Sequence, residues 1–214
     1  NSSSPATVVQ SGIVVNVSTA VTNSSQISRN TIHSLSNASG AAQTSIYAMD
    51  LTLPATNNIG ANANVIERNL IHSLSNTSTD NTSQLWGIVQ RGSGTAGQPI
   101  TATVKNNMIR LGLDAAGNSI TSGLSIIGIR DIQGATGGAG TTVVSYYFNS
   151  VYIGGSGVAS SSPTYAFNGS ALVSTRGYVD NIFYNARSNA SGAGKNYAIS
   201  VAGTAVNPAG LTCN

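Results

Sequence analysis

The sequence predicts an all-β fold, a right-handed parallel β-helix (solenoid) of about five to six coils of roughly 38 residues with long Ser, Asn and Gly loops. Three observations predict it: an internal repeat, short segments in which apolar and polar residues alternate, and turn-forming polar residues between those segments. Hydrophobic residues make up 40% of the 214-residue chain and charged residues only 7%, which allows a core and argues against disorder. We expect residues 1–214 to form a single β-helix domain that is a fragment or subunit of a longer array.

The repeat is anchored by an asparagine two positions before an apolar residue. The segment from Arg29 to Asn37 recurs 39 residues later, from Arg68 to Asn76, with one difference, Thr31 against Leu70. Weaker copies complete five anchors, spaced by 39, 38, 42 and 32 residues: Asn30, Asn69, Asn107, Asn149 and Asn181. If the copies stack, these side chains lie in one line, and we expect a structural ladder of hydrogen-bonded amides rather than a ligand site.

A second motif follows the first by 14 to 18 residues and places an Ala or Gly between two large apolar residues. Alternation predicts strands with one buried face. We therefore expect a core column formed by the leading large residues, which are Tyr47, Trp86, Ile127, Tyr165 and Tyr197. By the same alternation, we expect the small residues of the motif to face outward.

A further column comes from the residue directly after the apolar member of the asparagine motif. It contains His33, His72, Arg110, Tyr152 and Tyr184. Alternation points this column away from the core. Two interpretations stay open, a binding stripe for glycans or another surface, since aromatic and arginine side chains provide contact area, and an exposed stack beneath loops. Two histidines without a third partner do not make a zinc site, so we expect no metal and no cofactor.

Catalysis by a β-helix enzyme that cleaves polysaccharides requires clustered carboxylates. The six acidic residues are at least 13 positions apart in sequence, so we expect no catalytic centre. The net charge is +3, but the nine Lys and Arg residues are spread along the chain, which argues against nucleic-acid binding. A lone cysteine, Cys213, gives no disulfide framework, and the apolar runs are too short for membrane insertion.

Four strings in the chain carry a family resemblance. They are the repeat from Asn30 to Asn37, Asn-Asn-Met-Ile-Arg-Leu-Gly-Leu-Asp (106–114), Tyr-Phe-Asn-Ser-Val-Tyr-Ile-Gly-Gly (147–155) and Asp-Asn-Ile-Phe-Tyr-Asn-Ala-Arg-Ser-Asn (180–189). They resemble repeats in very large surface proteins of Bacteroidetes and related bacteria, which are similar to right-handed parallel β-helix proteins and often carry a C-terminal sorting domain. The resemblance covers roughly residues 27–212 and implies a secreted or cell-surface, adhesin-like protein.

These observations together predict a structural or adhesive extracellular β-solenoid module, a rigid rod or filament-forming surface protein without catalysis. The alternative is a carbohydrate-binding or polysaccharide-degrading β-helix protein. The open ends of a solenoid expose unpaired strand edges. We therefore expect self-association, head-to-tail or lateral, or further repeats of the same chain, with surface glycans as a second class of partner.

Overall fold

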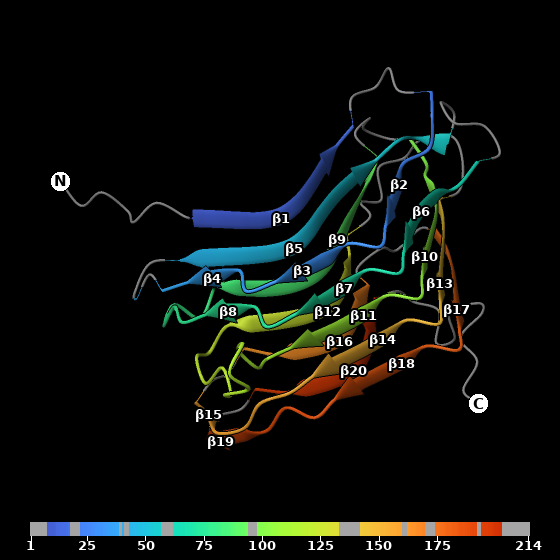
Figure 1. Cartoon of the computed structure of the whole chain (residues 1–214). Coiled ribbons are helices and arrows are strands. Elements are labelled where there is room, and N and C mark those ends of the chain that lie inside the picture. Colours follow the sequence, from blue (N-terminus) through green and yellow to red (C-terminus); the bar gives the residue numbers. More distant parts are fainter. Residues whose placement is uncertain are drawn as a thin grey trace.

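Three parallel β-sheets wrap around a common hydrophobic core in the computed structural model of the chain (Figure 1). The structure describes residues 8–17, 22–38, 40, 43–56, 62–93, 98–132, 142–159, 162–169, 174–191 and 194–202, so Cys213 lies outside the described residues. The prediction of an all-β parallel solenoid with a repeat of roughly 38 residues is confirmed. Each large sheet holds five or six strands, which correspond to about four full turns. The right-handedness of the coil stays a prediction, and this handedness is the usual one for crossovers between parallel strands.

One coil passes through sheets B, C and A in turn. Sheet A contains β1 (Val8–Asn16), β5 (Thr44–Leu53), β9 (Gln84–Ser93), β12 (Ser125–Asp131), β16 (Thr164–Gly169) and β20 (Asn196–Val201). Sheet B contains β2 (Gln26–Ser28), β6 (Asn64–Glu67), β10 (Thr101–Lys105), β13 (Thr142–Tyr147) and β17 (Ser174–Val179). Sheet C contains β3 (Thr31–His33), β7 (Leu70–His72), β11 (Met108–Leu111), β14 (Ser150–Ile153) and β18 (Ile182–Asn185). Two small sheets pair β4 (Ser36–Asn37) with β8 (Ser75–Asn76) and β15 (Val158–Ala159) with β19 (Asn189–Ser191).

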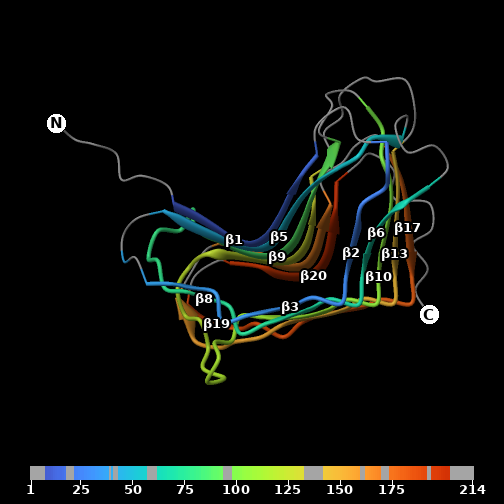
Figure 2. The same cartoon turned by 45° about the horizontal axis from the view of Figure 1, so that its top comes forward.

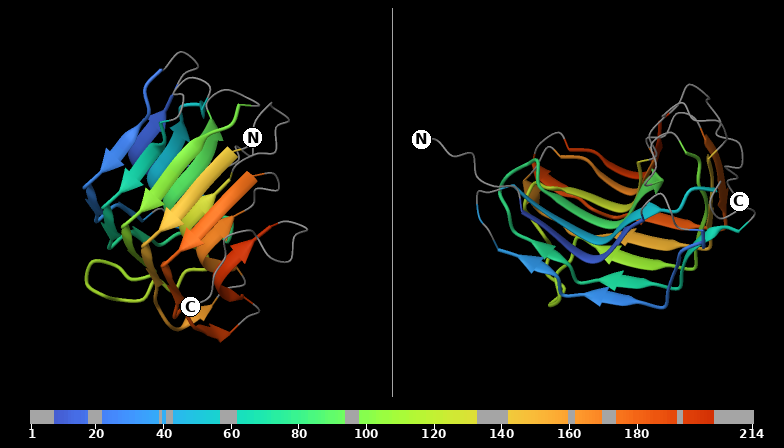
Figure 3. Two further views of the ribbon diagram at one scale, coloured as in Figure 1. Left: turned by 90° about the vertical axis from the view of Figure 1, so that its right-hand side faces the viewer. Right: turned by 90° about the horizontal axis from the view of Figure 1, so that it is seen from above.

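Equivalent residues of successive coils lie directly beside one another, as the rows of parallel strands in Figure 3 show. In sheet C the inward-facing column is Ile32, Ile71, Ile109, Val151 and Phe183. Its three central members are at most 2% exposed. Burying an apolar side chain of this size contributes roughly 1.5–3 kcal/mol. The column therefore stabilises the stacking of one coil on the next.

A tight corner joins each strand of sheet B to the following strand of sheet C. The corner residue has a φ between 52° and 59° in every coil; these residues are Arg29, Arg68, Asn106, Phe148 and Asp180. Few residues other than glycine adopt this left-handed conformation, and it persists where the surrounding structure fixes it. Here the asparagine that follows each corner residue is hydrogen-bonded to a neighbouring coil, and Asn69, Asn107 and Asn149 are bonded on both sides.

These asparagines form a ladder along the solenoid. Asn69 is typical: its backbone N–H and its side-chain Nδ2 donate to Asn107 Oδ1 at 3.1 and 2.9 Å, and Nδ2 also donates to the Ile27 carbonyl at 3.0 Å. The same pattern links Asn30, Asn69, Asn107, Asn149 and Asn181 in order. The three central asparagines are buried. The bonds from neighbouring coils remove the cost of leaving buried amides unpaired.

The strands of sheet A bend midway along their length (Figure 2). At the bend two consecutive residues face the core, as Ala48 and Met49 do in β5, and these two belong to the main core. The first of the pair must be small: a side chain at Gly128 would clash with Val151 Cγ1 of sheet C. The bend therefore breaks the simple alternation of inward and outward residues.

The predicted core column is wrong for this reason. Because the small residue of the motif faces inward, the large residue before it faces outward. Tyr47, Trp86, Ile127, Tyr165 and Tyr197 accordingly lie on the outer face of sheet A, and the first four pack in a cluster separate from the main core. The outward orientation predicted for the Ala and Gly residues is wrong by the same argument.

Candidate functional site

The outer face of sheet C carries three rows of side chains that run along the solenoid. The corner row contains Arg29, Arg68, Asn106, Phe148 and Asp180. The first outer row contains Thr31, Leu70, Met108, Ser150 and Ile182, and the second outer row contains His33, His72, Arg110, Tyr152 and Tyr184. The structure thus brings the five residues of the predicted exterior column into one register, each paired with its counterpart in the next coil.

The angle between neighbouring rings changes along the second outer row. His33 and His72 are stacked with ring centroids 5.4 Å apart and planes at 7°. Their Nδ1 atoms lie 3.0 and 2.8 Å from the hydroxyls of Ser34 and Ser73. Tyr152 and Tyr184, in contrast, are 5.7 Å apart and tilted by 51°. The tilt leaves part of the tyrosine ring faces available to another molecule.

An open hollow of about 390 Å³ lies over the last four coils of this face. Its walls come from both outer rows, and its floor includes Ser150, whose small side chain lies between Met108 and Ile182 in the first outer row. Met108 is 60% exposed and Ile182 is 64% exposed. Large apolar side chains left exposed side by side mark surfaces that contact other molecules.

The charges on this face are almost all positive. The strands β3, β7, β11, β14 and β18 present no carboxylate outward, and the only acidic residue in the three rows is Asp180 in the corner row. Arg29, Arg68 and Arg110 form no ion pair and no side-chain hydrogen bond within the part of the chain that the structure describes. The sequence placed only Arg110 in the exterior column, and the fold brings Arg29 and Arg68 to the same face.

The outer face of sheet A carries the aromatic row that was predicted to be core. Tyr47 and Trp86 stack with centroids 5.0 Å apart, and Tyr165 and Tyr197 stack with centroids 5.3 Å apart. Arginine side chains cover the first pair: Arg91 lies 5.5 Å from the Tyr47 ring and Arg130 lies 5.9 Å from the Trp86 ring. Trp86 is only 8% exposed. The ring faces of Tyr47 and Trp86 are therefore used in contacts within the protein, whereas Tyr197 in the last coil is 38% exposed.

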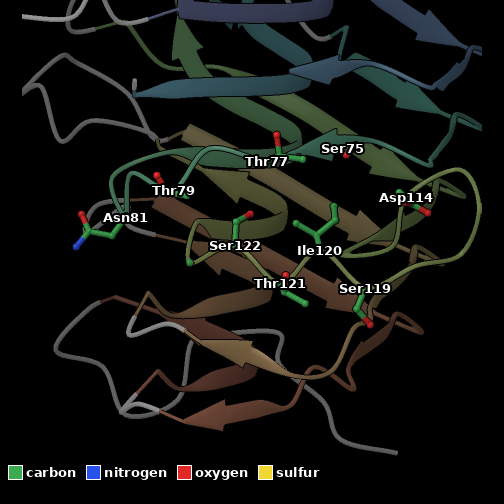
Figure 4. Close-up of a pocket in the computed structure, with 10 residues that line it drawn as sticks. Ser75, Thr77, Thr79, Asn81, Asp114, Ser119, Ile120, Thr121 and Ser122 are labelled. Carbon is green, nitrogen blue, oxygen red and sulfur yellow. The ribbon is translucent and has the colours of Figure 1, made fainter. Parts of the chain in front are cut away.

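A second hollow, of about 620 Å³, is lined mainly by hydroxyl side chains (Figure 4). One wall follows β8 and includes Thr77 and Thr79, and the other is the loop at residues 114–123. Asp114 lies at its rim, but its carboxylate accepts bonds within the loop from Ala116 and Asn118, and the bonds from Asn118 lower the pKa of that carboxyl.

The loop of this second hollow is fixed from behind by a buried arginine. Arg187 donates to the Ile120 carbonyl at 2.6 Å and to the Gly154 carbonyl at 3.2 Å. Burial lowers the pKa of Arg187 to about 10. The hollow offers neutral hydroxyl groups on a fixed loop, without a charged group free for chemistry.

Sequence reasoning missed a buried ion pair inside the solenoid. The Arg176 guanidinium donates to both Asp131 oxygens, at 2.5 and 3.1 Å, and Tyr146 Oη donates to Asp131 Oδ2 at 2.7 Å. Burial and the charge on Asp131 raise the pKa of Tyr146 well above its usual value. The only signal in the sequence was Asp131 two positions after the strand motif, because its partner is 45 residues away. The group is structural, since all three side chains are buried.

Three further carboxylates are also bonded to neighbouring side chains, which bears on catalysis and metal binding. Asp50 pairs with Arg91, Glu67 lies 3.4 Å from Lys105 Nζ, and Asp80 accepts from Thr82. Among the described residues, no group of three or more His, Cys, Asp or Glu side chains is placed to hold a metal ion.

No protein-family model, no curated protein and no solved structure matches the chain. Among the described residues, no helix has the length and apolar character needed to cross a membrane.

Proposed function

We propose that this chain is a non-catalytic structural and adhesive module of a secreted or cell-surface protein, in which a stiff solenoid presents the outer face of sheet C to an extracellular partner. The observation that carries the proposal is the exposure of large apolar side chains, Met108, Ile182 and Tyr184, in register on one face. Met108 lies on β11, which is paired on both sides, and Ile182 and Tyr184 lie on the edge strand β18, which is paired with β14, so all three are carried by one hydrogen-bonded sheet. A rigid surface loses little conformational entropy on binding.

The bonds that the carboxylates already form within the protein support a non-catalytic module. Glycoside hydrolysis needs two carboxyl groups facing the same bond, roughly 5–10 Å apart. Here five of the six acidic side chains are bonded to a basic residue or to their own loop, and they are distributed over separate parts of the structure. The resemblance to repeats of bacterial surface proteins supports an extracellular location and the right-handed coil.

The adhesive function can be tested with a panel of extracellular polysaccharides. Wild-type protein should be retained on at least one polysaccharide without releasing reducing sugars. A variant with Met108→Ser and Tyr184→Ser should lose retention while its unfolding temperature stays unchanged, because both side chains are exposed. Release of reducing sugars by the wild type would instead indicate an enzyme, and equal retention of the variant would exclude the sheet C face.

The partner at the end of the solenoid is proposed to be a second copy stacked head to tail. In the last described coil the core residues Phe183, Ile199 and Val201 are only partly buried. The ladder ends are complementary: within the described residues Asn181 donates no bond from its backbone N–H, and Asn30 accepts none at Oδ1. Head-to-tail stacking that does not close into a ring repeats without limit and forms filaments.

Light scattering after size-exclusion chromatography tests this arrangement. The wild type should form oligomers whose mass rises with concentration, and Phe183→Glu should reduce them to monomers by placing a charge in the contact. A wild-type protein that remains monomeric over the whole concentration range would contradict head-to-tail assembly.

A further inference from the structure

The arginines of the sheet C face indicate the charge of the ligand. This inference rests on the proposed adhesive function. Arg29 and Arg68 are exposed in adjacent coils of the corner row, and Arg110 follows in the next coil on the second outer row. All three lack a partner within the described residues, whereas Arg91 and Arg176 are paired with carboxylates. Unpaired cations on one face attract an anionic partner.

The two parts of the face differ in character along the solenoid axis. The first three coils carry the three arginines with His33 and His72, and the apolar hollow extends over the last four coils, with Tyr152 and Tyr184 in the last two. A ligand that covers the whole face must therefore combine negative charge with apolar surface. It must also be long, because the four spacings between five coils, at about 4.8 Å each, add up to roughly 19 Å.

We propose that the sheet C face binds a polysaccharide that carries carboxylates, lying along the solenoid axis. Its carboxylates pair with Arg29, Arg68 and Arg110, for which a planar guanidinium is well suited. The C–H faces of its sugar rings pack on Tyr152 and Tyr184, whose mutual tilt of 51° leaves ring surface available.

The backbone of sheet C argues against an acidic peptide as the occupant. The inner strands β7, β11 and β14 are paired on both sides, so their backbone groups are already bonded. A peptide on this face could not add as a strand, and its own backbone groups would need partners elsewhere. A sugar polymer keeps its hydroxyl groups in water while one side of each ring contacts the protein.

Calorimetric titration with defined probes tests the proposal. The probes are two unbranched oligouronates (oligogalacturonate and oligomannuronate), their carboxyl-reduced neutral forms, polyglutamate and single-stranded DNA. At least one oligouronate should bind with an affinity that falls as salt is added. Its reduced form should bind at least about tenfold more weakly if the charge pairs carry recognition.

Charge-matched variants locate the binding. Arg68→Gln and Arg110→Gln should each weaken oligouronate binding by about fivefold, the upper range for an exposed charge pair. Lys195→Gln removes the same charge from an exposed position outside the face and should change binding less than about twofold. All three variants should unfold at the wild-type temperature.

The outcomes separate this proposal from the adhesive function. Equal binding of the acidic and reduced oligosaccharides would overturn the role of the carboxylate and leave a neutral glycan as the adhesive partner. Stronger binding of polyglutamate or DNA that depends on Arg68 would overturn the polysaccharide. If neither oligouronate binds, the proposal is also rejected, and the polysaccharide panel would still decide the adhesive function.

Discussion

The outer faces of sheets A and C are built in the same way but differ in how they are used. Both carry rows of aromatic and arginine side chains at one residue per coil. On sheet A the Tyr47 and Trp86 rings stack at 26° beneath arginines, and on sheet C the Tyr152 and Tyr184 rings are tilted by 51° beside exposed apolar residues. The register of the coils creates a row, and the groups above the row decide whether it stabilises the protein or remains available for binding.

The largest expected effect on stability comes from the aromatic row on the outer face of sheet A, where arginine side chains cover Tyr47 and Trp86. Trp86→Ala should lower the free energy of unfolding by about 3–5 kcal/mol, because it removes a large, nearly buried ring and leaves a cavity between Tyr47 and Ile127. Urea unfolding measures this change. Trp86→Phe is the matched control: it keeps a ring in the stack and should cost less than about 1.5 kcal/mol. A Trp86→Ala protein as stable as the wild type would remove the contrast between the two faces.

The orientation of sheet A is tested by a change on its inner side. Gly128→Val should destabilise the protein by about 1–3 kcal/mol or more, because the new side chain meets Val151 inside the core. Gly40→Val provides the control, since a Cβ at Gly40 has no neighbour within 4 Å, and it should stay within about 0.5 kcal/mol of the wild type. If both variants unfold at the same urea concentration, Gly128 faces outward and the aromatic row returns to the core.

The smallest effect on stability is expected on sheet C. Tyr184→Ala should change the free energy of unfolding by less than about 0.5 kcal/mol, as is usual for exposed positions. It should nevertheless reduce retention on the polysaccharide that binds the wild type. A loss of several kcal/mol in the same urea titration would mean that this row, like that of sheet A, is mainly structural.

The repeats in the sequence were enough to predict the solenoid and the residues that share a row. Asn30 and Asn69, or His33 and His72, occupy equivalent positions in two nearly identical segments, and equivalent positions must meet when coils stack. The side on which a row lies could be predicted only where the strand alternates regularly. The strands of sheet C alternate regularly, and the second outer row faces outward. In sheet A the bend places Ala48 and Met49 both inward, which reverses the orientation of Tyr47.

Contacts between different positions of the repeat could not be predicted. Asp131 and Arg176 come from different sheets, and neither has a charged counterpart at the equivalent position of most other coils. Their pairing depends on the width of the core near the end of β12, which no local pattern encodes. Arg29 and Arg68 were missed for a related reason, because they belong to the corner row and not to the exterior column in which Arg110 was predicted.

Hydroxyl-radical footprinting read by mass spectrometry tests the contrast between the faces most directly. The two methionines provide an internal scale, since Met49 is fully buried and Met108 is 60% exposed. We predict that Met108 and Tyr184 are oxidised many times faster than Met49, and that Trp86, although intrinsically reactive, is oxidised at a rate close to that of Met49. Oxidation of Trp86 as fast as Met108 would show that the row on sheet A is as open as the face on sheet C, and would contradict the account.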